Sequence, residues 1–281
     1  MNFTFVFILV LTAGLVHPRP WKNTLDKRHR LYVRIVGGHE APRSQYPWQV
    51  SLQMLDERGH REHFCGASVI SPSQVLTAAH CLFNRDLTKV RVVLGAHDGI
   101  HEEDSRQQVV GVGGARIHPG FDINSMTNDM AVITLDQVAV FNDRVKAIRL
   151  PSEDEDPDEG QSCVSTGWGN TNMGTAFIPP KTLQAVRLSV ISHEVCKNKL
   201  ESFLNVDETM MCAHDFAGGK GSCTGDSGGP LVCVNSNGPY LAGVVSWGIV
   251  PCGDADHPSV FAKVNHFLNF ILADDSNGLI Q

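Results

Sequence analysis

The chain has 281 residues, of which 42% are hydrophobic and 19% are charged, and its formal net charge is −7 at pH 7. This length allows one large all-β domain, and this hydrophobic content favours a folded chain over a disordered one. Residues 15–34 hold six basic side chains against one acid, so the rest of the chain is more acidic than the whole. We therefore expect neither nucleic acid nor an anionic membrane as a partner.

The first residues predict a secretory signal. Residues 2–16 carry no charge, their length is short for a membrane span, and Ala13 and Gly14 are small enough for a cleavage site. No basic residue precedes the apolar run, which leaves an uncleaved anchor as the alternative. We assign residues 1–14 to a signal peptide and expect a secreted, extracellular protein.

Residues 15–34 predict a spacer, because they contain two prolines and many charges but no apolar period. The sequence changes character directly after Arg34, at the run Ile35-Val36-Gly37-Gly38. Cleavage after Arg34 would create a new α-amino group on Ile35. A buried ammonium needs a buried carboxylate, and Asp226 is the candidate. The alternative is that the run is only a strand entering a turn.

From Pro47 onward, short apolar runs alternate with turn signals, which is typical of an antiparallel sandwich or barrel. Examples are residues 48–52, 90–94 and 130–135. The acidic run from Glu153 to Glu159 is expected in a solvated loop between two barrels. Helical periodicity is convincing only near the end, on one face of a short helix formed by Val264, Phe267, Leu268, Ile271 and Leu272.

Three segments carry side chains suited to nucleophilic catalysis, although each also has a structural explanation. His80 ends an apolar strand, where a lone histidine is usually structural. Asp129 stands at the mouth of a buried strand, where an unpaired carboxylate is costly and an imidazole N–H is a suitable partner. Ser227 lies among glycines that permit a tight turn, and the N–H groups of Gly225 and Ser227 could point into one oxyanion hole. A serine nucleophile also needs a base beside it.

The eight cysteines indicate disulfides, because their number is even and the chain has a predicted secretory signal. Counting alone allows 105 pairings. No Cys-x-x-Cys pair occurs, which argues against zinc. His60 and His63 could suggest a metal, but no cysteine or carboxylate set converges on them in sequence, so we expect a pair in a surface loop. We predict neither a metal nor a cofactor.

Five motifs in order resemble the chymotrypsin family of trypsin-like serine proteases, from Ile35 to about Leu272. The resemblance implies an all-β fold of two perpendicular six-stranded antiparallel β-barrels with a short C-terminal helix. It also implies a serine endopeptidase domain over residues 35–281, preceded by an activation propeptide over residues 15–34. The motifs are Ile35-Val36-Gly37-Gly38, Thr77-Ala78-Ala79-His80-Cys81, Asn128–Leu135, Gly225–Leu231 and Ser246-Trp247-Gly248.

The resemblance also assigns roles. Ser227 would attack the peptide carbonyl, His80 would act as general base and then acid, and Asp129 would hold the imidazole tautomer. The N–H groups of Gly225 and Ser227 would form the oxyanion hole. No cysteine is left to tether the propeptide, which should therefore be released on activation. The implied disulfides are Cys65–Cys81, Cys163–Cys233, Cys196–Cys212 and Cys223–Cys252.

Three positions bear on the bond that is cut. By the resemblance, Gly221 forms the base of the specificity pocket, where cleavage after basic residues needs an aspartate. Gly248 leaves the mouth open, while Ser259 replaces the usual glycine and should make the pocket shallower. We therefore expect cleavage after apolar residues, as in chymotrypsin or elastase.

Further expectations concern the surroundings of this pocket. Ser246, Trp247 and Gly248 should pair with the substrate backbone as an antiparallel strand. The nearby Asp254 and Asp256 leave cleavage after basic residues as an alternative.

Calcium-binding relatives carry a glutamate directly after the glycine that corresponds to Gly95. Here that residue is Ala96, so we expect no calcium although Glu102, Glu103 and Asp104 remain. We expect protein or peptide substrates, protein protease inhibitors, an activating protease of trypsin-like specificity, and a monomer.

Two other functions are compatible with parts of the sequence. One is an inactive relative that serves as a binding protein, although such relatives usually lose the histidine or the serine. The other is a lipase or esterase, which the chain order and the absence of α/β alternation disfavour. An activating cut after Arg28 or Arg30 is also conceivable, but it would not place isoleucine first.

Overall fold

The computed structural model describes residues 36–97, 106–171 and 179–273. The chain divides into a unit of residues 1–32 and a unit of residues 33–281, and every described residue belongs to the second. The predicted signal peptide, the propeptide with Arg34, Ile35, and residues 102–104 of the presumed calcium loop lie outside the described residues. Within the described part, no helix is both long and apolar enough to cross a membrane.

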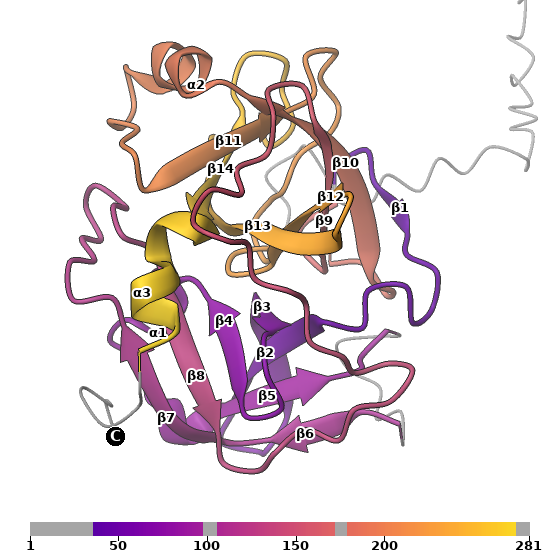
Figure 1. Ribbon diagram of the computed structural model, residues 1–281. Helices are drawn as coiled ribbons and strands as arrows, with labels where there is room; N and C mark the ends of the chain where they lie inside the picture. Colours follow the sequence, from indigo (N-terminus) through magenta and orange to yellow (C-terminus); the bar gives the residue numbers. More distant parts are fainter. Residues whose placement is uncertain (1–35, 98–105, 172–178, 274–281) are drawn as a thin grey trace, which may run out of the picture. The chain divides into compact units, whose positions relative to one another are not determined.

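The N-terminal half folds into a curled sheet of seven strands in the order β6-β5-β2-β3-β4-β8-β7. The two end strands, β6 and β7, are separated by Gly111 alone, so one continuous segment connects both ends of the strand order. This sheet occupies the lower half of Figure 1. Its strands are β2 (Gln49–Leu55), β3 (Arg61–Val69), β4 (Gln74–Thr77), β5 (Val90–Leu94), β6 (Gln108–Val110), β7 (Val112–Ile117) and β8 (Ala131–Leu135).

The second sheet closes into a barrel. Its order is β1-β10-β11-β14-β13-β12-β9, and an additional ladder between β10 and β9 closes six of these strands on themselves. The predicted all-β class is therefore confirmed, with one barrel closed by hydrogen bonds and one sheet that is curled. The strands are β1 (His39–Glu40), β9 (Ser162–Gly167), β10 (Gln184–Ile191), β11 (Met210–His214), β12 (Pro230–Asn235), β13 (Gly238–Trp247) and β14 (Ser259–Lys263).

The helices are short. At the C-terminus, a 3-10 turn (η2, Val264–Phe267) leads into α3 (Leu268–Ile271). Four of the five predicted apolar residues are buried, but Leu272 is 69% exposed, because the helix ends at Ile271. The remaining helical segments are α1 (Ala79–Leu82), η1 (Leu87–Lys89) and α2 (His193–Leu200).

Helix α2 was not expected from periodicity, because only Cys196 and Leu200 of its eight residues are buried. The Ser192 hydroxyl accepts a hydrogen bond from the N–H of Val195 and caps its first turn.

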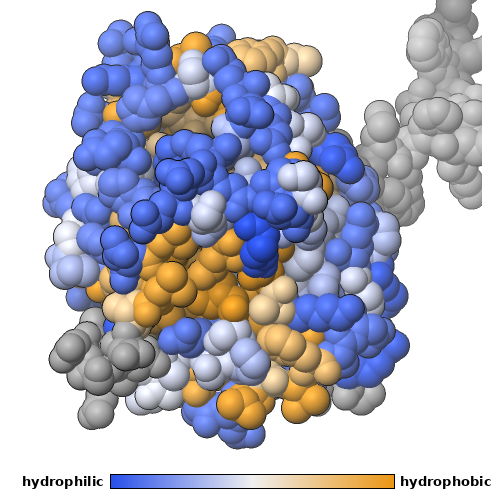
Figure 2. Space-filling view, viewed as in Figure 1, coloured by the Kyte–Doolittle hydropathy of each residue, from blue (hydrophilic) through white to orange (hydrophobic). Residues whose placement is uncertain are grey.

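The C-terminal helix fixes the second half of the chain to the first sheet. Val264, Phe267 and Ile271 join the large apolar core inside that sheet. Arg116 of β7 donates to the carbonyl oxygens of Ala273 and Ile271, which are otherwise without intrahelical partners at the helix end. In the view of Figure 1, Figure 2 shows hydrophobic residues gathering across the middle of the surface, while hydrophilic residues cover much of the part above.

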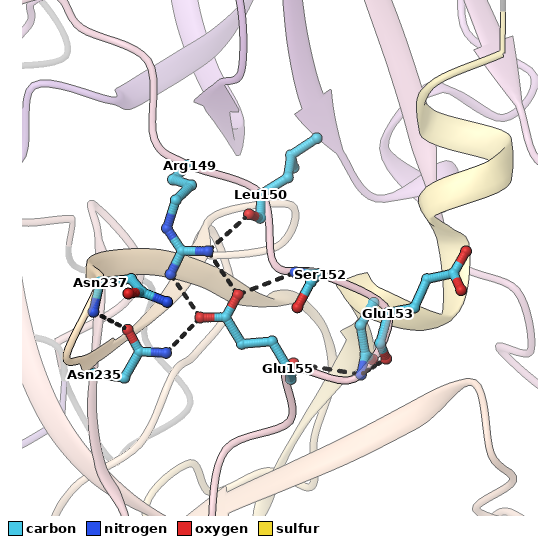
Figure 3. A network of polar contacts seen from close by, with 8 residues as sticks. Arg149, Leu150, Ser152, Glu153, Glu155, Asn235 and Asn237 are labelled. Atoms are coloured by element: carbon cyan, nitrogen blue, oxygen red, sulfur yellow. Dashed lines mark hydrogen bonds and ion pairs between the residues drawn. The ribbon is translucent and has the colours of Figure 1, made fainter.

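The acidic linker between the sheets, residues 153–159, is exposed for the most part, as expected. Glu155 is half-buried, and its carboxylate is hydrogen-bonded to neighbouring side chains (Figure 3). Arg149 binds its carboxylate through two nitrogens, each at 2.6 Å, and Asn235 of β12 also donates to it. The Arg149 guanidinium lowers the pKa of Glu155 to about 2. Arg149 also lies over the ring of Tyr240 in β13. These contacts hold the linker against the second barrel.

Candidate active site

Neighbouring strands bring His80 to Asp129. Strands β4 and β8 are antiparallel, and Thr77 at the end of β4 lies opposite Ala131 at the start of β8. His80 follows Thr77 by three residues, and Asp129 precedes Ala131 by two. The Asp129 carboxylate accepts hydrogen bonds from the backbone N–H of His80 at 2.9 Å and from its Nδ1 at 2.8 Å. Because an ionised carboxylate only accepts, Nδ1 carries a proton, and in the neutral ring Nε2 then presents the lone pair.

Asp129 is 1% exposed and is the acceptor for a third donor. The Oγ of Ser246 in β13 donates to its Oδ2 at 2.5 Å, across 117 residues of sequence. Three donors replace the water that the carboxylate loses on burial. The predicted substrate-binding Ser246 therefore also supports Asp129 and connects the two sheets at the site.

The turn around Ser227 packs on the first sheet. The N–H of Gly66 in β3 donates to the Ser227 carbonyl at 2.7 Å, and the N–H of Gly228 donates to the carbonyl of Val245. Gly228 has a positive φ of 78°, and a Cβ there would lie 2.2 Å from the Thr77 hydroxyl. Only glycine fits this position. The close approach leaves Gly228 next to Cys81, whose Sγ lies 3.8 Å from Nε2 of His80.

Ser227 thus lies beside the histidine, but the two side chains are not hydrogen-bonded in the described structure. Within the described residues, the Ser227 hydroxyl has no hydrogen-bond partner, and Nε2 of His80 has only the distant Cys81 sulfur. Bonds between nucleophile and base are often long in the absence of substrate. The structure therefore shows a direct hydrogen bond between His80 and Asp129. Ser227 lies near this pair without a hydrogen bond from its hydroxyl to either residue.

Two backbone N–H groups near Ser227 are available. In the described part of the chain, neither Gly225 N–H nor Ser227 N–H donates to another atom, while both carbonyls of these residues are bonded. Unpaired N–H groups are rare unless they meet water or a ligand. Both residues are half-buried, and Ser227 lines the pocket described below.

His63 corrects a sequence prediction. We expected it beside His60 in a surface loop, but it lies in β3 with both ring nitrogens bonded. Its Nε2 donates to the Gly225 carbonyl at 2.8 Å, and its Nδ1 accepts from the Ser51 hydroxyl at 2.8 Å. Burial lowers the pKa of His63 to about 4, so the ring is neutral near pH 7. The sequence gave no signal for this contact, because His63 and Gly225 are 162 residues apart.

Asp226 is buried without a described cation. It is 1% exposed, and its carboxylate accepts from the N–H groups of Gly169 and Cys223 at 2.8 and 2.9 Å. Burial raises the pKa of Asp226 to about 7. Among the described residues, no basic group lies within 4.0 Å of it. Val36, the residue after Ile35, is fully buried, and its carbonyl accepts from the N–H of Gly221.

A pocket of about 220 Å³ opens beside Ser227. Residues 222–224 and 245–248 form its walls together with Val250 and Cys252. Gly248 is exposed, with open space where a Cβ would stand. Gly221 and Ser259 do not line the pocket. A Cβ at Gly221 would meet the Gly253 nitrogen at 3.0 Å and the Ser259 hydroxyl at 3.4 Å, so the space next to Gly221 is filled.

All eight cysteines are paired, and the pairs are those that the resemblance implied. In the described residues, the one grouping with metal-ligand spacing is Cys65, His80 and Cys81. Because Cys65 and Cys81 form a disulfide, their sulfurs are not metal ligands. Ala96 is buried and offers no oxygen side chain, and the rest of its loop lies outside the described residues.

Comparison with known proteins agrees with this geometry. A family model described as "Trypsin" matches residues 35–271. The chain belongs to the trypsin family. It is 36% identical to Serine protease 1 of Canis lupus familiaris over 269 residues, which cover 95% of this chain and 96% of that protein. It is 34% identical to glandular kallikrein of Sus scrofa over 251 residues, 85% and 94% of the two chains.

A third relative, Trypsin epsilon of Drosophila erecta, is 38% identical over 239 residues, which cover 85% of this chain and 86% of that protein. Membership of this family makes the protein a serine endopeptidase, a hydrolase that acts on peptide bonds.

Proposed function

We propose that this trypsin-family protein is a secreted zymogen that hydrolyses peptide bonds after apolar residues, with Ser227, His80 and Asp129 as its catalytic triad. The observation that carries the triad is the paired arrangement of His80. Its Nδ1 is fixed by Asp129, and its Nε2 is left without a strong partner on the side of Ser227. This is the tautomer that a general base for a serine needs.

In the proposed reaction, Ser227 Oγ attacks the substrate carbonyl carbon while its proton passes to His80 Nε2. The oxygen of the tetrahedral intermediate accepts hydrogen bonds from the N–H groups of Gly225 and Ser227. His80 then gives the proton to the leaving amine as the C–N bond breaks, and an acyl-enzyme remains. Water then attacks the carbonyl carbon of the acyl-enzyme while its proton passes to His80. His80 returns the proton to Ser227 Oγ, and the carboxylic acid product leaves. Fixed donors at the developing oxyanion make the largest contribution in such sites.

The shape of the pocket supports the apolar preference. By the resemblance, Gly221 occupies the position at which cleavage after a basic residue needs a carboxylate, and no described carboxylate lines the pocket. Asp254, the nearby acid, is bound to the His257 ring at 2.7 Å and to two backbone N–H groups. These bonds favour apolar specificity over the basic alternative. Ser246, Trp247 and Gly248 border the pocket and can pair with the substrate backbone.

The unpaired Asp226 supports activation by cleavage. A buried charge without a partner is costly, and the cleaved α-ammonium of Ile35 would supply one. Val36, its chain neighbour, is already held at Gly221, close to the loop that carries Asp226. An activating protease would therefore cut after Arg34 and release residues 15–34. The ion pair between the new ammonium of Ile35 and Asp226 would then stabilise the turn at Gly225.

Secretion is supported by the uncharged residues 2–16 and by four disulfides, which persist in oxidising compartments. The proposed partners are protein or peptide substrates, protein inhibitors and the activating protease. We also propose that the enzyme is a monomer.

An organophosphonate active-site label distinguishes the enzyme from an inactive binding protein. After cleavage at Arg34, we expect one label per molecule on Ser227, and none in Ser227→Ala. Cleaved protein that takes up no label would contradict the proposed triad. If uncut and cut protein hydrolysed a peptide substrate at the same rate, the proposed zymogen would be contradicted.

Peptides with Phe, Leu, Ala or Arg before the cleaved bond test the specificity of the activated protein. Dominant cleavage after Arg would overturn the proposed apolar preference.

A further inference from the structure

Arg85 presents a positive charge next to the segment that carries His80, and it does not line the pocket beside Ser227. Its Nε donates to the carbonyl of Cys81, the neighbour of His80, at 2.8 Å. Its guanidinium carbon lies 4.1 Å from the centre of the Phe64 ring. The disulfide between Cys65 and Cys81 joins the two segments that carry this pair. The position of the Arg85 charge is therefore set by one hydrogen bond and one ring contact.

A β-bulge presents the Phe64 ring to Arg85. In the ladder between β2 and β3, Leu52 pairs with Cys65 and Gln53 pairs with His63, so Phe64 has no partner in register. Bulges change the direction of a side chain and interrupt pairing, and they are common beside active sites. Phe64 is half-buried and Arg85 is exposed. The pair forms a small surface of one apolar ring and one cation.

The location of this pair relates it to the leaving half of a substrate. The N–H of Gly66 bonds the Ser227 carbonyl, so β3 runs along the Ser227 turn. No residue of β3 lines the pocket, whose walls are residues 222–224 and 245–248. The acyl half of a peptide fills that pocket in the proposed function. The Cys65–Cys81 disulfide, which joins the segments of Phe64 and Arg85, lies beside His80 and does not line the pocket. We therefore place the residues after the cleaved bond on the side of Phe64 and Arg85.

The charge of Arg85 is not neutralised in the described structure. No described carboxylate lies within 4.0 Å of its guanidinium, and the exposed Glu62 on the same strand as Phe64 forms no ion pair with it. Contact with an aromatic face stabilises a cation without cancelling its charge. A planar guanidinium suits a carboxylate through two parallel hydrogen bonds.

We propose that Phe64 and Arg85 form a subsite on the leaving-group side that favours an acidic side chain at the first or second residue after the cleaved bond. This inference rests on the proposed function, because it assigns the pocket to the acyl half of the substrate. The expected substrates are proteins in which the residue before the cleaved bond is small or medium-sized and apolar, and in which Asp or Glu is the first or second residue after that bond.

The test uses quenched fluorescent peptides that share one acyl half with Leu before the cleaved bond. The two following positions carry Glu, Gln or Lys in turn, and kcat/KM is compared within each enzyme. For the activated protein we expect Glu to exceed Gln by about two- to fivefold, the range of an exposed ion pair. High salt should reduce the ratio.

Substitutions assign the effect to Arg85. Arg85→Gln should bring the Glu to Gln ratio to one, Arg85→Lys should retain part of it, and Arg85→Glu should reverse it in favour of Lys. The control is Arg187→Gln, which removes an exposed arginine from β10 in the other sheet and should leave the ratio unchanged. Ratios within one variant are independent of how much of that variant is folded.

Two failures are distinguishable. Peptides that are cleaved with no acidic preference, or with a preference that Arg85→Glu leaves unchanged, would overturn this inference alone. A cleaved protein that neither cuts any peptide nor takes up the phosphonate label would overturn the proposed function on which it rests.

Discussion

The Ser246 hydroxyl donates to Oδ2 of Asp129 at 2.5 Å, and this bond connects strand β13 of the closed barrel to the residue two positions before strand β8 of the curled sheet. The same oxygen also accepts from His80 Nδ1. The orientation of the imidazole therefore depends on residues from both halves of the chain.

Asp129 should matter far more than the hydroxyl that supports it. For Asp129→Asn we expect kcat to fall by about 10⁴, the cost known for this change in the well-studied enzymes of the family, because the wrong imidazole tautomer results. For Ser246→Ala we expect a loss within about tenfold, because two donors to the carboxylate remain. Steady-state kinetics with a peptide substrate measure both. Equal losses in the two variants would contradict this order.

Acid should destabilise the protein through His63. Burial lowers the pKa of His63 to about 4, below the value of about 6.5 for an unfolded chain. Between these values the unfolded state binds more protons, so folding stability falls as pH drops from about 6.5 to about 4. The loss reaches up to about 3 kcal/mol, since one pKa unit is about 1.4 kcal/mol.

His63→Gln removes this titration and keeps a polar side chain near Gly225. Urea unfolding from pH 7 to pH 4, in a Ser227→Ala background that prevents self-digestion, should give a flatter curve for the variant. His60→Gln is the control, because His60 is exposed and bonds only to Asp56. Parallel curves for His63→Gln and the parent would show that this ring does not control the acid transition.

Asp226 should make the uncut chain less stable as pH rises, which is the opposite of the effect of His63. Its folded pKa of about 7 exceeds the unfolded value of about 3.9, so the folded state binds more protons and stability falls as pH rises from about 4 to about 7. The loss reaches up to about 4 kcal/mol at about 1.4 kcal/mol for each pKa unit.

Arg34→Gln keeps the chain uncut for this measurement. Adding Asp226→Asn should stabilise that protein relative to its parent above pH 7 and should make little difference at pH 4. Asp143→Asn, which changes an exposed acid, should have no such pH dependence. If Asp226→Asn shifted stability equally at every pH, the buried charge would not be the cause.

Ser259 should limit the depth of the specificity pocket. Its Oγ lies 3.4 Å from the Cβ position of Gly221 and accepts from the N–H of Ser222 at 3.2 Å. Ser259→Gly removes this side chain and should raise the kcat/KM ratio of Phe over Ala peptides by about tenfold, the lower end for added apolar contacts in a pocket. An unchanged ratio would place the limit on pocket depth elsewhere, in the Gly253 backbone.

Gly228 should not tolerate a side chain. Gly228→Ala combines a positive φ with a Cβ only 2.2 Å from the Thr77 hydroxyl and 2.4 Å from the Gly66 carbonyl. We expect a loss of more than about 3 kcal/mol in unfolding free energy, together with loss of activity. Gly238→Ala separates the two causes, because φ is 97° there but nothing lies within 4 Å, and it should cost about 1 kcal/mol. Similar losses at both positions would show that φ, and not the contact, decides.

The sequence by itself determined the all-β class, the short C-terminal helix and the family, because these depend on local patterns. Alternating apolar runs, turn residues and the short motifs around His80, Asp129 and Ser227 can each be recognised within about ten residues. Periodicity failed at Leu272, which lies beyond the end of α3, and at helix α2, which buries only Cys196 and Leu200.

Only the tertiary structure decided which hydrogen bonds and side-chain contacts connect these segments. Ser246 meets Asp129 across 117 residues, and His63 meets the Gly225 carbonyl across 162. No periodic pattern encodes such pairs, because strand register and a close glycine contact create them. The pairing of Arg85 with Phe64 likewise depends on one bulge in β3. The local sequence supplied the reactive groups, and the packing of two sheets supplied their orientation.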